Sequence, residues 1–301
     1  MTKQLLLQPH PEFKRVYGGG IIRWFDKTPH DIFCPHFWEL NWAYGCRFEC
    51  SYCYLQGTFH GNKKPWYRPL EQVIKTLDEF FEEQNKFQVL NSGELTDSFV
   101  YPHLIDQIAD KFETQDKHKL LLLTKSGNVN FLVEKPRKQT IASFSISAPE
   151  VWNRWEKKTP SPEKRIDAAR KVREAGYETR IRIDLIFPIE NWQRCYDQLL
   201  NMLFSKLTPN RITLGTPRGL QKTLMFSKDL SWTEYFAEDS GWGKKLSSAV
   251  RKEIYLFFHD RLSDLGFNKI ALCKETVSMW EELDREAGVF KSWEKKCNCA
   301  W

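Results

Sequence analysis

An alternation of short β-rich runs with helical patterns is the feature that most constrains the fold of this chain. The runs with the composition of strands are Phe37–Tyr44, Phe87–Leu90, Lys119–Thr124, Ser143–Ser147, Tyr177–Phe187 and Arg211–Gly215. Apolar residues at helical spacing lie between several of them, at Leu70–Gln84, Pro162–Ala175 and Trp192–Phe204. Strands separated by helices form βα units with parallel strands. About six such units fit before residue 216, which is too few for a closed eight-unit barrel.

The sequence therefore predicts an α/β fold, a partial (β/α)6 TIM-like barrel with a C-terminal helical, Cys-bearing extension. A long helix is expected at Leu246–Leu265 and a last strand at Lys269–Leu272. We expect the chain to divide into a lead-in (1–33), the partial barrel (34–216), a helical part with the last strand (217–275) and a Cys-bearing tail (276–301).

Three cysteines that directly follow the first expected strand point to a metal centre. Cys46, Cys50 and Cys53 are separated by three and then two residues. Zinc sites favour paired Cys-x-x-Cys units with a fourth ligand nearby, whereas three thiolates on a four-iron cubane leave one iron open. The spacing, with aromatic Tyr52 before the last cysteine, resembles the radical S-adenosylmethionine superfamily. That resemblance implies a 4Fe–4S cluster whose open iron binds S-adenosylmethionine, which is cleaved to methionine and a 5′-deoxyadenosyl radical.

The likeness continues beyond this loop and resembles the spore photoproduct lyase family, whose members reverse a thymine photoproduct in DNA. The matching segments are Cys53–Gln56, Lys64–Arg68, Leu123–Lys125, Phe144–Ile146, Thr159–Pro162, Lys164–Ile166 and Ala175–Tyr177. They cover roughly residues 36–275. The resemblance implies that Lys125 and Ser145 contact S-adenosylmethionine, with Tyr52 in the same cofactor-binding set. It also places Tyr54 where the family has a tyrosine proposed as a catalytic radical relay.

The stretch Leu90–Asp97 departs from the family pattern because it contains no cysteine. The family carries a cysteine there that returns a hydrogen atom to the product radical, so this step is expected to lack its usual donor. Gly93-Glu94 in the same stretch instead resembles a glycine–glutamate motif of many radical S-adenosylmethionine enzymes. That motif implies binding of the methionine amino group by backbone and carboxylate. The alternative for Glu94 is an ordinary loop residue.

Three further cysteines, Cys273, Cys297 and Cys299, lie at or beyond the end of the resemblance. They could hold an auxiliary iron–sulfur cluster, with Cys34 as fourth ligand or with an open iron, or they could hold zinc. They could also be redox thiols that replace the missing hydrogen donor, or inert residues. We predict a metal, because a folded-back tail brings two thiols to one centre and a metal would tether a tail with little core. Cys195 lies in a predicted helix and is expected in the core.

Charge and aromatic content favour an anionic substrate. The formal net charge is +6, and the segment 63–68 combines basic and aromatic side chains that suit phosphates and bases. The leading hypothesis is therefore radical S-adenosylmethionine catalysis on DNA or another nucleic acid or nucleotide, similar to spore photoproduct lyase. The alternatives are radical modification of a peptide or small metabolite with an auxiliary cluster, and a redox or structural iron–sulfur protein without catalysis.

The sequence also gives expectations about location and partners. Its start has no long apolar region typical of a secretory signal, and no stretch approaches the roughly 20 apolar residues of a membrane span. We expect a cytoplasmic protein with no membrane partner, whose eight cysteines are thiols or metal ligands. A cluster that must be reduced implies an electron donor such as flavodoxin or ferredoxin.

Overall fold

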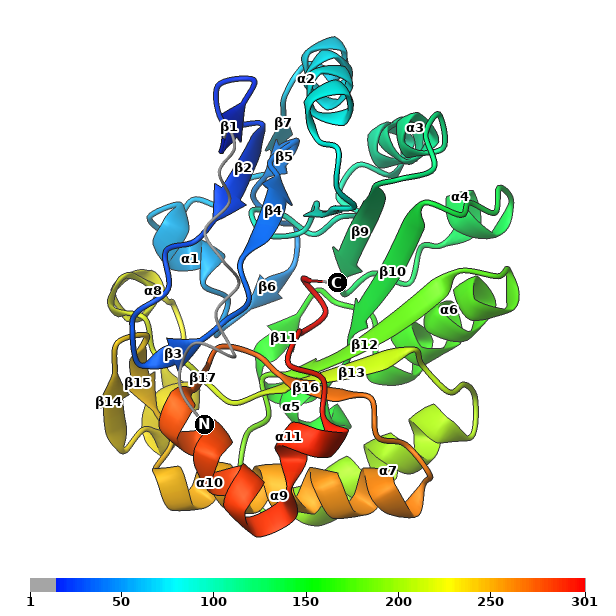
Figure 1. The fold of residues 1–301 in the computed structure, drawn as a ribbon. Coiled ribbons are helices and arrows are strands. Elements are labelled where there is room, and N and C mark those ends of the chain that lie inside the picture. Colours follow the sequence, from blue (N-terminus) through cyan, green and yellow to red (C-terminus); the bar gives the residue numbers. More distant parts are fainter. Residues whose placement is uncertain (1–14, 301) are drawn as a thin grey trace.

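The computed structural model describes residues 15–300, and a curved nine-stranded sheet lies at its centre (Figure 1). In spatial order the strands are β1 (Val16–Tyr17), β2 (Ile22–Phe25), β4 (Phe37–Leu40), β8 (Val89–Asn91), β9 (Lys119–Thr124), β10 (Thr140–Ser145), β12 (Glu178–Asp184), β13 (Arg211–Gly215) and β16 (Ile270–Leu272). The strands from β4 to β16 run parallel, while β1 and β2 add an antiparallel pair beside β4. The first 14 residues of the expected lead-in, and Trp301, lie outside the described residues.

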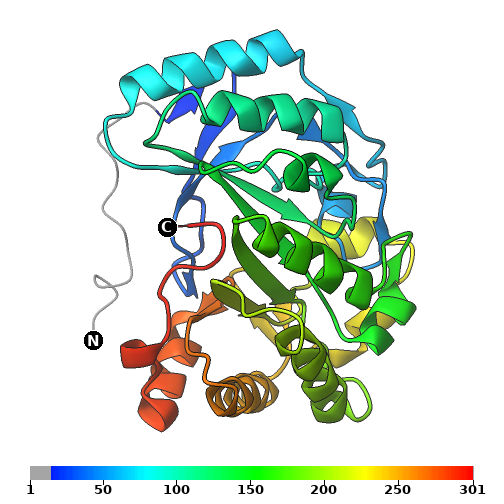
Figure 2. The same cartoon turned by 90° about the vertical axis from the view of Figure 1, so that its right-hand side faces the viewer.

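Each of the first six parallel strands is followed by a helix that lies on the outer face of the sheet (Figures 1 and 2). These helices are α2 (Leu70–Glu83), α3 (Pro102–Phe112), α4 (Asn130–Val133), α6 (Pro162–Glu174), α7 (Trp192–Phe204) and α9 (Ser248–Asp264). The predicted partial (β/α)6 barrel is confirmed, and the expected last strand pairs in parallel with β13. The division into four parts stays a prediction.

Shorter elements lie around the barrel. Four two-stranded ladders join β3 (Ile32–Phe33) to β17 (Glu275–Thr276), β5 (Ala43–Tyr44) to β7 (Trp66–Tyr67), β6 (Glu49–Cys50) to β11 (Glu156–Lys157), and β14 (Glu238–Ser240) to β15 (Gly243–Lys245). The remaining helices are α1 (Leu55–Thr58), α5 (Pro149–Trp155), α8 (Gln221–Phe226), the 3₁₀ helix η2 (Ser231–Tyr235), α10 (Val277–Ala287) and α11 (Val289–Ser292). Within residues 15–300, no helix combines the length and apolar character needed to cross a membrane.

Local sequence explains the sharpest boundaries. Helix α6 begins where the Ser161 hydroxyl accepts a hydrogen bond from the Lys164 backbone nitrogen, with Pro162 in the first turn. It ends before Gly176, whose φ of 94° suits a residue without a Cβ. Strand β9 is a run of leucines, of which Leu120, Leu121 and Leu122 are fully buried between β8 and β10. Strands buried on both faces have such continuous apolar runs.

The C-terminal tail enters the barrel. Figure 1 shows the tail that precedes Trp301, drawn in red, within the curve of the sheet. The Asn298 side chain is fully buried there and donates to Ser143 Oγ at 2.8 Å and to the Ile181 carbonyl at 2.9 Å. The Thr213 hydroxyl donates to Asn298 Oδ1 at 2.8 Å. Because these partners belong to β10, β12 and β13, the tail fills part of the lumen between three strands.

Candidate active site

The cysteine loop begins at a glycine whose backbone no other residue can adopt without strain. Gly45 has a φ of 76°, and a Cβ there would lie 2.6 Å from the carbonyl oxygens of Lys63 and Lys64. Its nitrogen donates to the Leu95 carbonyl at 2.8 Å, and its own carbonyl accepts from the Thr96 hydroxyl at 2.7 Å. The loop is thus fixed against the segment that follows β8.

The three cysteines of the loop face one small cavity of about 120 Å³. Cys50 lies in β6, and the Gln56 amide donates to its carbonyl at 3.0 Å. Burial raises the pKa of the Cys50 thiol well above its ordinary value, against the opposing charge of Lys125. Three thiols around one cavity fit a cubane that is held by three thiolates. Because the thiols must lose their protons to bind metal, assembly of a cluster here would release protons.

A buried glutamate holds Lys125 in the cavity wall. The Lys125 ammonium donates to Glu156 Oε1 at 2.9 Å and to the Tyr52 hydroxyl oxygen at 3.2 Å. Arg165 Nη2 lies 2.5 Å from Glu156 Oε2. Burial opposes ionisation of this carboxyl, but Lys125 and Arg165 outweigh it and lower the pKa of Glu156 to about 2. An ammonium has three donors, so Lys125 keeps one for a ligand.

Glu94 is positioned by its neighbours after β8. The Asn91 amide donates to Glu94 Oε1 at 2.8 Å and its oxygen accepts from the Gly93 nitrogen at 2.9 Å. The Tyr54 hydroxyl donates to the Glu94 carbonyl oxygen. A Cβ at Gly93 would lie 2.6 Å from the Leu123 Cβ, so glycine is required where this loop passes β9.

A larger cavity of about 430 Å³ brings most of the predicted site residues together. Its lining includes Cys50, Cys53, Tyr52, Tyr54, Gly93, Glu94, Lys125, Ser145, Cys273, Cys297 and Cys299. Cys46 lines only the smaller cavity, which shares Cys50 and Cys53 with the larger one. In the part of the chain that the structure describes, no group of three or more His, Cys, Asp or Glu side chains is placed to hold a metal ion. Metal and cofactor binding at these residues therefore stays a prediction.

Sequence reasoning missed several charged residues in and behind the cavity wall. Glu156 and Arg165 lie behind Lys125 and are far from the cysteine loop in sequence, and the β6–β11 ladder brings Glu156 opposite Cys50. Glu39 lines the larger cavity itself, where Arg23 Nη2 lies 2.6 Å from its carboxylate. No local sequence signal points to these charges. Cys195 is buried in α7, as predicted.

The family model described as spore photoproduct lyase matches residues 37–215, which is more than half of the chain. The chain belongs to the spore photoproduct lyase family. It is 27% identical over 178 residues to spore photoproduct lyase of Clostridium acetobutylicum, which covers 56% of this chain and 52% of that protein. It is 29% identical over 178 residues to the Bacillus subtilis protein, with the same coverage. The chain thus spans about half the length of these curated relatives.

Solved structures of spore photoproduct lyase have a similar fold. A double mutant with bound AdoMet and dinucleoside spore photoproduct superposes with a TM-score of 0.67 at 22% sequence identity. The match covers 80% of this chain and 76% of the lyase chain. At 22% identity this likeness shows only that the two proteins share a fold.

Proposed function

We propose that this protein is a radical S-adenosylmethionine enzyme that acts on DNA or another nucleic acid or nucleotide, in the manner of spore photoproduct lyase. The proposal rests on one observation: Glu94, Lys125 and Ser145 line the same two cavities as the cysteine loop. The two cavities share these lining residues. The motifs come from the carboxyl ends of neighbouring parallel strands, which is where barrel enzymes bind their ligands.

Each residue of this set has a chemical role in the proposal. Cys46, Cys50 and Cys53 would hold a 4Fe–4S cluster, which when bound supplies the electron for cleavage of S-adenosylmethionine. Glu94, whose carboxylate is held by the Asn91 amide, and the backbone of Gly93 would accept hydrogen bonds from the amino group of the cofactor. Lys125 offers its remaining donor to the carboxylate.

The remaining cavity residues orient the cofactor and substrate. Ser145 offers a hydroxyl at the end of β10, and Tyr52 fixes the Lys125 ammonium through its own oxygen. Tyr54 contacts Glu94 and is 39% exposed, so it can reach both the cofactor and a substrate in the mouth of the cavity. A reductant such as flavodoxin or ferredoxin is part of the proposal.

An exposed aromatic surface beside the cysteine loop supports a nucleic-acid substrate. Trp66 and Tyr67 on β7 are 51% and 48% exposed. Trp66 stacks on Tyr44 with ring centroids 4.1 Å apart, and Arg68 Nε donates to the Tyr44 hydroxyl at 3.0 Å. Exposed aromatic rings next to cations suit stacked bases and phosphates. One similar solved structure holds a dinucleoside spore photoproduct.

Binding of labelled oligonucleotides across a range of salt concentrations tests the substrate class. We expect affinity to fall steeply with salt, because phosphate contacts release counterions. Replacing Trp66 with Ala should weaken binding about tenfold, since stacking contributes roughly 1–3 kcal/mol per base. Val133→Ala, which changes an exposed residue on α4, is the matched control. An affinity that does not change with salt or with the Trp66→Ala substitution would favour a peptide or small metabolite as substrate.

A further inference from the structure

Four thiols outside the cysteine loop line the larger cavity together. Cys34, Cys273, Cys297 and Cys299 are each at most 5% exposed, and all four line that cavity. They come from distant parts of the chain, so their meeting is a product of the fold. Thiolates are the ligands that iron–sulfur clusters use.

Strand pairing brings the first two thiols together. Phe33 in β3 lies opposite Glu275 in β17, which places Cys34 beside the turn that carries Cys273. The Cys273 nitrogen also donates to the Leu214 carbonyl at 2.7 Å. This turn is therefore tied both to the barrel sheet and to the segment before β4.

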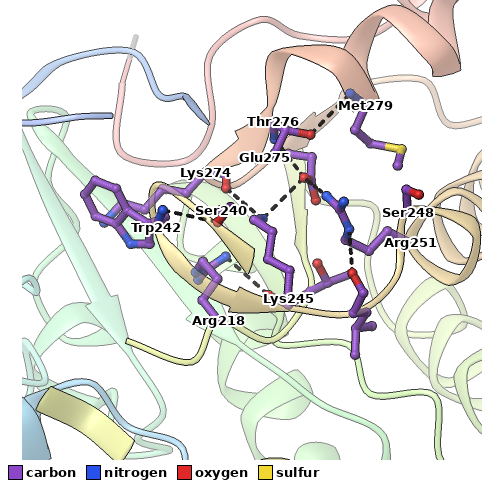
Figure 3. Close-up of polar contacts among 12 residues, drawn as sticks. Arg218, Ser240, Trp242, Lys245, Ser248, Arg251, Lys274, Glu275, Thr276 and Met279 are labelled. Atoms are coloured by element: carbon purple, nitrogen blue, oxygen red, sulfur yellow. Dashed lines mark hydrogen bonds and ion pairs between the residues drawn. The ribbon is translucent and has the colours of Figure 1, made fainter. Parts of the chain in front are cut away.

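A buried charge network supports the same turn (Figure 3). Glu275 is fully buried and accepts from Lys245 Nζ at 3.3 Å, from the Tyr255 hydroxyl at 2.7 Å and from Arg251. Between Cys273 and Glu275, the Lys274 ammonium lies 4.8 Å from the centre of the Trp242 ring, inside the cavity. The network therefore fixes the positions of the Cys273 thiol and the Lys274 ammonium.

The tail that carries the other two thiols is equally fixed. Besides the Asn298 contacts, Arg180 donates to the carbonyls of Asn298 and Ala300 at 2.8 and 3.0 Å. Arg211 donates to the carbonyls of Cys297 and Ala300 at 3.1 Å each. Buried carbonyls that are satisfied in this way hold the backbone around Cys297 and Cys299 in one position.

Cations surround the sulfurs. Arg182 donates from one nitrogen to Cys299 Sγ at 3.1 Å and from the other to Cys273 Sγ at 3.0 Å. A guanidinium only donates, so both sulfurs act as acceptors, and metal-bound thiolates keep this capacity. Arg182 and Arg218 share the single carboxylate of Asp184, at 2.7 and 2.9 Å. Lys274 and Glu94 line the same cavity, and Glu94 Oε1 lies 3.9 Å from Cys299 Sγ. Three cations, Arg182, Arg218 and Lys274, thus face two carboxylates, and this positive balance suits an anionic centre.

We propose that Cys34, Cys273, Cys297 and Cys299 bind a second iron–sulfur cluster in the wall of the larger cavity. Among the described residues no three of these side chains are placed to hold a single metal ion, so a polynuclear centre suits them better than one zinc ion, which needs its sulfurs at about 2.3 Å from one point. With four protein ligands no iron stays open. This cluster would exchange single electrons and tether the tail, and it goes beyond the proposed function without depending on it.

Metal content after removal of the first site tests the proposal. In the anaerobically reconstituted triple variant Cys46→Ala, Cys50→Ala and Cys53→Ala, we expect about four irons and four sulfides per chain. Adding Cys297→Ser and Cys299→Ser should remove them. Adding Cys195→Ser instead, a buried thiol of α7 outside the cavity, should change nothing. Far-UV circular dichroism confirms that each variant is folded. A triple variant that contains no iron, or that contains zinc in place of iron, would overturn the proposal.

Spectroscopy of the wild-type protein gives a test that needs no substitution. We expect about eight irons per chain, and electron paramagnetic resonance of the reduced protein should show two cluster signals. Adding S-adenosylmethionine should shift only the signal of the cluster with an open iron. About four irons with a single signal would refute a second cluster even if the first site is active.

Discussion

Replacing Glu156 with Gln should destabilise the protein strongly. Gln keeps the size of the side chain and removes the charge that balances Lys125 and Arg165, at 2.9 and 2.5 Å. The Glu156 and Arg165 side chains are fully buried, while that of Lys125 is 17% exposed and can turn toward solvent. Most of the loss should therefore come from Arg165. Breaking a buried pair by removing one partner costs about 3–5 kcal/mol.

The matched control is a surface pair on the helix that carries Arg165. Arg170 and Glu174 lie 2.7 Å apart on α6, with side chains 36% and 60% exposed. Replacing Glu174 with Gln should cost less than about 0.5 kcal/mol. Urea unfolding of both variants gives the free energies. With an m-value of about 3 kcal/mol/M, the Glu156→Gln midpoint should fall by about 1 M or more. A Glu156→Gln protein no less stable than the Glu174→Gln protein would refute the role of Glu156.

Three further outcomes are expected. Burial, aided by Lys117, lowers the pKa of His118 from 6.5 to about 4, so between these values the unfolded chain binds a proton that the folded chain does not. Stability should therefore fall by up to about 3 kcal/mol as the pH drops through this window, and urea unfolding of His118→Phe should lack this slope. Asn298→Ala removes three buried hydrogen bonds of the tail, so limited proteolysis should cut the tail about tenfold faster than in wild type. Asn201→Ala, on the exposed face of α7, should be cut at the wild-type rate. Chromatography of photoproduct DNA should show no efficient reversal, because residues 90–97 contain no cysteine; fast thymine recovery would contradict this.

Strongly patterned segments were predictable from the sequence. The ranges expected for β9, α7 and β13 coincide with those observed, because leucine runs and helical apolar spacing specify them locally. Strand β2 and helix α3 were not predicted. Strand β2 (Ile22–Phe25) is short and depends on antiparallel pairing with β4, so a tertiary contact rather than local propensity defines it.

The site was predictable where chemistry and spacing coincide in one segment. The cysteine loop and Gly93-Glu94 are such segments, and the fold brings them to joined cavities. The counter-charge of Lys125 was not predictable, because Glu156 reaches it through the pairing of β6 with β11. Cys34 was considered as a partner of the tail thiols, and the pairing of β3 with β17 is what brings it to the turn that carries Cys273.

Formation of 5′-deoxyadenosine tests the central claim most directly. Anaerobically reconstituted protein, reduced with dithionite and supplied with S-adenosylmethionine, should form 5′-deoxyadenosine and methionine, measured by liquid chromatography with mass detection. Replacing Cys46, Cys50 or Cys53 with Ala should abolish the product, because in the proposed site each thiolate would hold one iron of the cluster. Cys195→Ser should match wild type, since this thiol is buried in α7 away from the cavity. Undiminished product in the variant that lacks all three loop cysteines would contradict the assignment of this site.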